Sequence, residues 1–132
     1  MRPKRNPEHL APAELDLMER LWSEGRQTAR ALREALYPKS EKSQHGTVQR
    51  LLLRLVEKGF VVRDTTLSTH FFEPAVSREA YGGRQIESVA KKLTGGSLTP
   101  LLSHLLEHER LSAEEIARLR ELLDDASEGG DR

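Results

Sequence analysis

The chain has 132 residues, with 21 basic and 21 acidic side chains, and is 36% hydrophobic and 32% charged. This length suffices for one domain, or for one small domain with an appended element. The composition is too apolar for a wholly disordered chain, yet polar enough that short helices sharing a core with a second chain fit better than one large compact core. The absence of cysteine excludes disulfide scaffolds, iron–sulfur clusters, thiolate zinc sites and cysteine nucleophiles.

Apolar runs in the chain are short. The longest, such as Leu51–Leu53 and Phe60–Val62, have three residues, so we predict no membrane insertion. The basic segment 1–7 has no apolar region after it and does not resemble a secretory signal. The expected location is the cytoplasm.

The balanced total charge hides an asymmetry between the two halves. Residues 1–64 hold 13 basic and 9 acidic side chains, a net charge of +4, and residues 65–132 hold 8 basic and 12 acidic, a net charge of −4. The first half therefore suits a polyanion as its partner. Charge alone leaves open a solvated surface with chance clustering.

Three helices are expected in the first half, at about residues 12–24, 29–36 and 44–58. Pro12 suits a first helical position and Thr28 a cap, while Gly25 and Gly59 are typical helix ends. Apolar residues recur at the spacing of one buried face in each helix. They are Leu15, Leu17, Met18, Leu21 and Trp22 in the first, Ala29, Leu32 and Leu36 in the second, and Val48, Leu51, Leu52 and Leu55 in the third.

A β-hairpin is expected after the third helix. The β-rich runs 60–63 and 70–73 flank a loop, and Pro74 ends the second run. Three helices followed by a hairpin is the order of the winged helix-turn-helix, whose third helix enters the DNA major groove. We therefore predict a mostly α fold, with a flexible basic arm over residues 1–9 and a winged-helix DNA-binding domain over residues 10–76.

The outer face of the third helix carries side chains suited to DNA. Arginine can bind guanine, and glutamine adenine, through two hydrogen bonds, and first-turn amides can hold a phosphate. The predicted DNA-binding residues are Lys39, Lys42, Ser43, Gln44, His45, Gly46, Thr47, Gln49, Arg50, Arg54, Arg63 and Thr66. The alternative is that Arg50 and Arg54 form a solvated stripe on a structural helix.

Three further helices are expected, at about residues 77–93, 99–109 and 113–125, with caps at Ser77, Thr99 and Ser112. Such short helices do not close a core alone, so we predict a helical dimerisation domain over residues 77–125 and a homodimer, followed by a disordered tail over residues 126–132. The predicted dimerisation residues are Leu98, Leu101, Leu102, Leu105, Leu106, Ile116, Leu119, Leu122 and Leu123. Packing of these helices against the winged unit of the same chain is the alternative.

The sequence contains only weak matches to catalytic motifs. His104 and His108 match the H-x-x-E-H pattern of zinc peptidases, but Leu105 and Leu106 between them belong to the apolar stripe, and the sequence marks neither a third ligand nor a substrate cleft. There is no Gly-rich phosphate loop and no G-x-S-x-G motif. We predict no enzymatic activity, no metal site and no cofactor.

The chain also resembles the penicillinase-repressor family (BlaI/MecI type) over about residues 10–125. The segments that carry the resemblance are 10–22, 47–60, 71–81, 95–98, 111–116 and 119–123. It implies a homodimeric transcriptional repressor on a palindromic operator. In the resistance members of the family, a sensor-linked protease cleaves the dimerisation region and frees the promoter.

Three departures from the family pattern stand out. His104–Leu105 replaces the usual Asn-Phe cleavage site, the cysteine metal site of the copper-responsive relatives is absent, and residues 65–69 replace a Gly-Arg pair in the wing. We predict a DNA-binding repressor, with antibiotic or cell-wall stress genes as candidate targets. The alternatives are a winged-helix protein-interaction module without DNA binding, or a small-molecule-responsive regulator.

Overall fold

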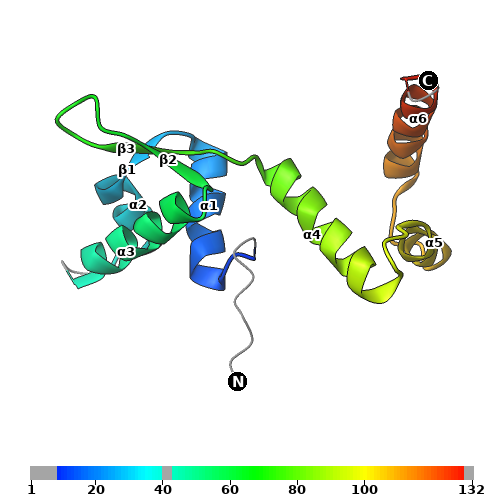
Figure 1. Ribbon diagram of the computed structural model, residues 1–132, viewed down its shortest axis with the longest axis horizontal. Helices are drawn as coiled ribbons and strands as arrows, with labels where there is room; N and C mark the ends of the chain where they lie inside the picture. The colour runs from blue at the N-terminus through cyan, green and yellow to red at the C-terminus, as the bar shows by residue number, and fades with distance from the viewer. Residues whose placement is uncertain (1–8, 40–42, 130–132) are drawn as a thin grey trace. The chain divides into compact units, whose positions relative to one another are not determined.

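The computed structural model describes residues 9–39 and 43–129, so the predicted N-terminal arm lies almost wholly outside the described residues. The elements are α1 (Pro12–Glu24), β1 (Gln27–Thr28), α2 (Ala29–Leu36), α3 (Ser43–Glu57), β2 (Val61–Asp64), β3 (Phe71–Pro74), α4 (Arg78–Leu93), α5 (Thr99–Glu107) and α6 (Ala113–Gly129) (Figure 1). The chain divides into two compact units, residues 1–85 and 86–132.

Helices α1 and α2 begin and end where the sequence predicts, and α3 begins and ends one residue earlier than predicted. At the start of α1, the Glu14 carboxylate accepts a hydrogen bond from the Ala11 amide at 2.8 Å. At the start of α2, Thr28 Oγ1 accepts one from the Ala31 amide at 3.1 Å. Gly59, after α3, has a φ of 82°, a conformation that glycine adopts without a Cβ penalty.

The predicted hairpin is confirmed, with each strand one residue later than expected. β2 and β3 pair antiparallel, and β1 pairs with the other edge of β3, which gives the order β1-β3-β2. In Figure 1 the connection between β2 and β3 projects beyond the strands as a loop. Because β1 leads directly into α2, the sheet fixes the start of α2 beside the hairpin.

The core of the first unit lies between α1, α2, α3 and the sheet. Its buried hydrophobic residues are Leu10, Leu17, Met18, Leu21, Ala29, Leu32, Val48, Leu51, Leu52, Leu55, Phe60, Val61, Phe72 and Tyr81. The predicted inward faces of α2 and α3 are confirmed, whereas the placement of Leu15 in the core is wrong. At about 100° per residue, Leu17, Leu21 and Met18 centre on Glu14, and Leu15 lies beyond the edge of this arc.

The first turn of α4 belongs to the first unit. Ser77 caps α4 as predicted, since its Oγ accepts a hydrogen bond from the Ala80 amide at 3.0 Å. The Tyr81 ring packs edge-on against Phe60, with centroids 5.6 Å apart, and its hydroxyl accepts a hydrogen bond from the Leu10 amide. These contacts explain why the first compact unit extends to residue 85, past the hairpin.

The second unit has little core of its own. Among its described residues, Ala90 is the one buried hydrophobic side chain, and Leu93, Leu106, Leu122 and Leu123 are exposed. Most of the predicted dimerisation residues are exposed, and Leu101 and Ile116 are half-buried. In the described ranges, no helix combines the length and apolar character needed to cross a membrane.

The helix ends of the second unit need three corrections. Helix α5 ends at Glu107, two residues before its predicted end. Thr99 is the first residue of α5, and the position before it is Leu98, whose side chain makes no capping bond, so Thr99 is not the cap. The Ser112 cap is confirmed, because its Oγ accepts a hydrogen bond from the Glu115 amide. However, α6 continues to Gly129, so residues 126–129 are helical where a disordered tail is predicted.

Candidate DNA-binding surface

Helix α3 has one buried and one exposed face. Val48, Leu52 and Leu55 are fully buried against the core. The opposite face exposes Gln49, Arg50, Leu53, Arg54 and Glu57, as the helical spacing predicts. The buried side chains therefore fix the orientation of α3. The guanidinium groups of Arg50 and Arg54 and the amide of Gln49 lie on its outer side.

The structure describes most of the predicted DNA-binding residues. On or just before α3, Lys39, His45, Gln49, Arg50 and Arg54 are exposed, and Gln44, Gly46 and Thr47 are half-buried. Arg63 on β2 and Thr66 in the hairpin loop are exposed. Lys42 lies outside the described residues, and Ser43 is described only as the first residue of α3.

The first turns of α3 carry a glycine that the fold does not require. A Cβ at Gly46 would meet only the end of the Arg50 side chain, at 3.7 Å from Nη1, which is ordinary contact with a flexible group. Glycine inside a helix costs about 1 kcal/mol relative to alanine. His45 and Gln49 lie one helical turn apart on α3. His45 Nε2 lies 3.2 Å from Gln49 Nε2, and this contact orients both side chains on the exposed face.

The base of the hairpin is held by Asp64. Its carboxylate accepts hydrogen bonds from the Thr66 hydroxyl and amide and from the Arg26 guanidinium at 2.7 Å. The bonds from Thr66, together with the charge of Arg26, hold the pKa of Asp64 below its usual range. Arg26 also lies over the Phe71 ring, 4.4 Å from its centroid. In the free protein the Thr66 hydroxyl therefore organises the loop.

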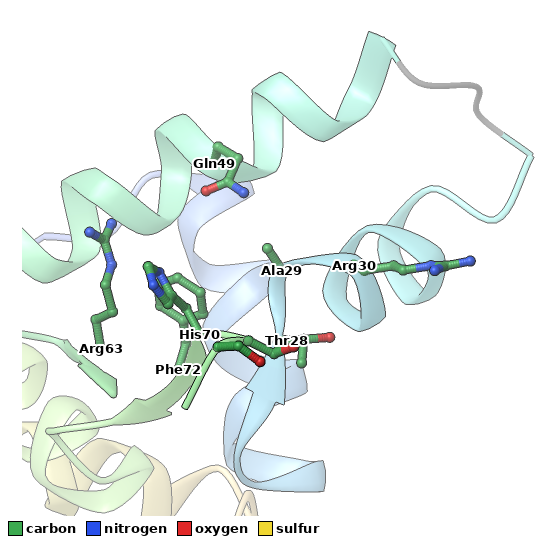
Figure 2. Close-up of a pocket in the computed structure, with 9 residues that line it drawn as sticks. Thr28, Ala29, Arg30, Gln49, Arg63, His70 and Phe72 are labelled. Carbon is green, nitrogen blue, oxygen red and sulfur yellow. The ribbon is translucent and has the colours of Figure 1, made fainter. Parts of the chain in front are cut away.

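A cavity of about 590 Å³ lies between α3, the hairpin and the start of α2 (Figure 2). It is lined by Thr28, Ala29, Arg30, Gln49, Arg63, Ser68, Thr69, His70 and Phe72. Of these residues, the predicted site includes Gln49 and Arg63. It omits Thr28, Ala29 and Arg30, because no local pattern relates them to the hairpin. The pairing of β1 with β3, distant in the chain, brings them to the hairpin.

The two histidines of α5 stack on each other. The His104 and His108 rings have centroids 4.0 Å apart, and His108 Nδ1 lies 2.9 Å from the His104 carbonyl oxygen. Within residues 9–39 and 43–129, no three histidine, aspartate or glutamate side chains gather as a metal site would need. The spacing of four residues along one helix explains why the rings of His104 and His108 stack.

The first unit has three helices and a three-stranded sheet that contains a hairpin, and its third helix is amphipathic with an exposed polar face. This arrangement defines a winged helix-turn-helix unit. The family model for the penicillinase repressor matches residues 10–125, so the chain belongs to this family of transcriptional repressors. It is 25% identical over 118 residues to a penicillinase repressor of Staphylococcus aureus, covering 89% of this chain and 93% of the relative. It is 26% identical over 116 residues to a penicillinase repressor of Bacillus licheniformis, covering 88% and 90%.

Proposed function

We propose that this protein represses transcription by binding, as a homodimer, to a pseudo-palindromic operator, with α3 of each copy in the major groove. The observation that carries the proposal is the outer face of α3. It presents Gln49, Arg50 and Arg54 to solvent beside an exposed wing, while the opposite face is fully buried. Exposed arginine and glutamine on a rigid helix are the side chains that read guanine and adenine edges.

Each exposed group has a distinct role in this proposal. Arg50 and Arg54 bind guanine O6 and N7, and Gln49 binds adenine N6 and N7. Gly46 lets the first turns of α3 approach the DNA closely, which accounts for a glycine that internal packing does not need. Arg63 on the wing and Lys39 before α3 bind backbone phosphates, which fix the register of the protein on the duplex.

The homodimer follows from the exposed leucines of α5 and α6. Leu102, Leu105, Leu119 and Leu122 are each more than a third exposed in the single chain. A two-fold dimer covers the same apolar patch on both copies. It also places two copies of α3 on two half-sites, so that the operator repeats with the symmetry of the dimer. The names of the two relatives make penicillinase genes the first candidate targets.

The proposed function does not require proteolysis within α5. His104–Leu105, which stands at the family's cleavage position, replaces the Asn-Phe pair and lies inside α5. The carbonyl of His104 accepts the hydrogen bond of the His108 amide, which a protease would have to break to bind an extended segment.

The test is selection of bound genomic fragments by the purified full chain at about physiological salt. We expect a pseudo-palindrome with half-sites separated by one helical turn or a multiple. The affinity for it should fall steeply with salt, because each phosphate contact releases counterions. No enriched site, from protein shown to be folded, would contradict the repressor and favour the protein-interaction module, whose binding has a shallow salt dependence.

A further inference from the structure

In the proposed binding mode, the cavity beside α3 lies between the helix in the major groove and the wing. In a winged helix, the third helix occupies the major groove and the wing lies along the adjacent backbone. Gln49 of α3 forms one side of the cavity, Arg63 and His70 of the hairpin form the other, and Thr28 lies at the start of α2 (Figure 2). On the proposed mode of binding, a backbone phosphate between the α3 contacts and the wing contacts reaches this cavity.

The charged groups around the cavity favour an anion. Besides Arg30, its described lining holds the cation Arg63 and the imidazole of His70, and it holds no carboxylate. The Arg30 side chain extends away from the cavity, where its Nε donates to Glu34 at 3.2 Å (Figure 2). The amides of Ala29 and Arg30, in the first turn of α2, have no acceptor inside the helix and point their positive ends outward.

The other titratable groups nearby are already engaged. Asp64 on β2 binds Arg26 and Thr66. His45 on α3 contacts Gln49. His70 is exposed and precedes β3 directly, so its ring is accessible to a ligand in the cavity.

We propose that His70 binds a DNA phosphate and that DNA binding takes up a proton at this side chain. A phosphodiester has no proton to donate, so the unprotonated nitrogen of a neutral imidazole cannot accept a hydrogen bond from it. Only the N–H of the neutral ring can bind the phosphate. The imidazolium offers an N–H bond and a positive charge, and such charge-assisted bonds are about twice as strong as neutral ones. The proton comes from solvent, and histidine charges between about pH 5 and 8. This inference rests on the proposed DNA-binding function and adds that a fall in pH strengthens repression.

The test is fluorescence anisotropy of the full chain with a fluorescein-labelled short DNA duplex of mixed sequence, at fixed salt, from about pH 8 to about pH 6. A phosphate contact is independent of base sequence, so the operator is not needed. We expect the affinity to rise about three- to tenfold as the pH falls. His70→Gln should remove this rise.

Two further variants separate the proposed role from a structural one. His70→Arg, which keeps a positive charge at every pH tested, should bind tightly at about pH 8 and show no rise at lower pH. His108→Gln, on α5 in the other unit, should keep the wild-type pH profile. Circular dichroism of each variant checks that the fold is retained.

Several outcomes would overturn the inference. A wild-type affinity that does not change with pH would do so, as would a His70→Gln variant that keeps the rise. A rise removed by His45→Gln and kept by His70→Gln would assign the proton to α3 instead. A folded wild-type chain that binds the duplex at neither pH would overturn the proposed DNA-binding function itself.

Discussion

Lys58, directly after α3, places its Nζ 2.8 Å from Oε1 of Glu14 in the first turn of α1. The Glu14 side chain is 1% exposed and that of Lys58 is 22% exposed, so the pair lies at the edge of the core. The same oxygen accepts the Ala11 amide, whereas Oε2 finds no hydrogen-bond partner among the described residues. The pair therefore joins the end of the candidate recognition helix to the start of α1.

Glu14→Gln should destabilise the first unit by about 1–3 kcal/mol. The substitution leaves the Lys58 ammonium without its counter-charge in a partly buried site and puts an amide where Oε2 has no partner. Breaking a fully buried pair costs more, but Lys58 keeps some contact with solvent. Urea unfolding measures the difference. Glu24→Gln, at an exposed pair with Arg20, is the control and should change the unfolding free energy by less than about 0.5 kcal/mol. Equal effects of the two variants would contradict a special role for the Glu14–Lys58 pair.

The stability of the first unit should fall at acid pH. Burial raises the pKa of Glu14, but the hydrogen bonds from Lys58 and Ala11 and the charges of Lys58 and Arg54 outweigh it and lower the pKa below its usual 4.5. A carboxyl with a lowered pKa stabilises the fold above its unfolded pKa, and this contribution is lost as the pH falls through the folded value. Unfolding free energies should therefore decrease below pH 4.5, and less so in Glu14→Gln. A wild-type profile that is flat in this range would contradict the predicted linkage.

Tyr81→Phe should cost about 1–2 kcal/mol of stability, because it leaves the buried Leu10 amide without the hydroxyl that accepts its hydrogen bond at 3.0 Å. Tyr81→Ala should cost more, about 3–5 kcal/mol, since it also removes the ring that packs on Trp22 and Phe60. Thermal and urea unfolding of the full chain would measure both. Equal losses in the two variants would show that the hydroxyl, rather than the ring, carries the contact.

Local signals made most of the first unit predictable. Pro12, Thr28 and Gly59 act on their own neighbours in the chain, so helix bounds follow from them. The buried face of α3 is likewise predictable, because four apolar residues recur at helical spacing. The exposed face follows as its complement, and with it the side chains proposed to read bases.

Long-range contacts were not predictable from the sequence. Glu14 is buried in the core, and Lys58, which pairs with its carboxylate, lies 44 positions along the chain, where no local pattern marks it as the partner. The cavity beside α3 depends on the pairing of β1 with β3, which is two residue pairs long and leaves no periodic pattern. Helix α6 extends past its predicted end. The polar composition of its last residues resembles a disordered tail, but no glycine or proline interrupts the helix before Gly129.

Arg50→Ala should weaken operator binding by about 1–3 kcal/mol and relax base preference at one position of each half-site. Arg63→Ala, on the wing, should instead weaken binding to all duplexes alike and reduce the salt slope by about one. Binding to the selected operator and to variants of it with single base changes would measure both. Arg20→Ala, on the exposed side of α1, is the control. A loss at Arg50→Ala that is equal for all base changes would make Arg50 a phosphate contact.

Leu105→Glu and Leu122→Glu should each convert the proposed dimer into a monomer. Leu105 and Leu122 are 38% and 47% exposed in the single chain, and a charge placed in a covered apolar interface costs far more than one in water. Sedimentation velocity gives the oligomeric state, and the matched control is Leu67→Glu in the hairpin loop, which is 58% exposed and lies outside the second unit. The two interface variants should also lose operator affinity. A monomer binds one half-site, whereas in a dimer the first bound copy holds the second copy at a high effective concentration near its half-site. Full dimerisation of both variants, or equal dissociation of Leu67→Glu, would place the interface elsewhere. Loss of the dimer without loss of operator affinity would show that a single winged-helix unit is sufficient for binding.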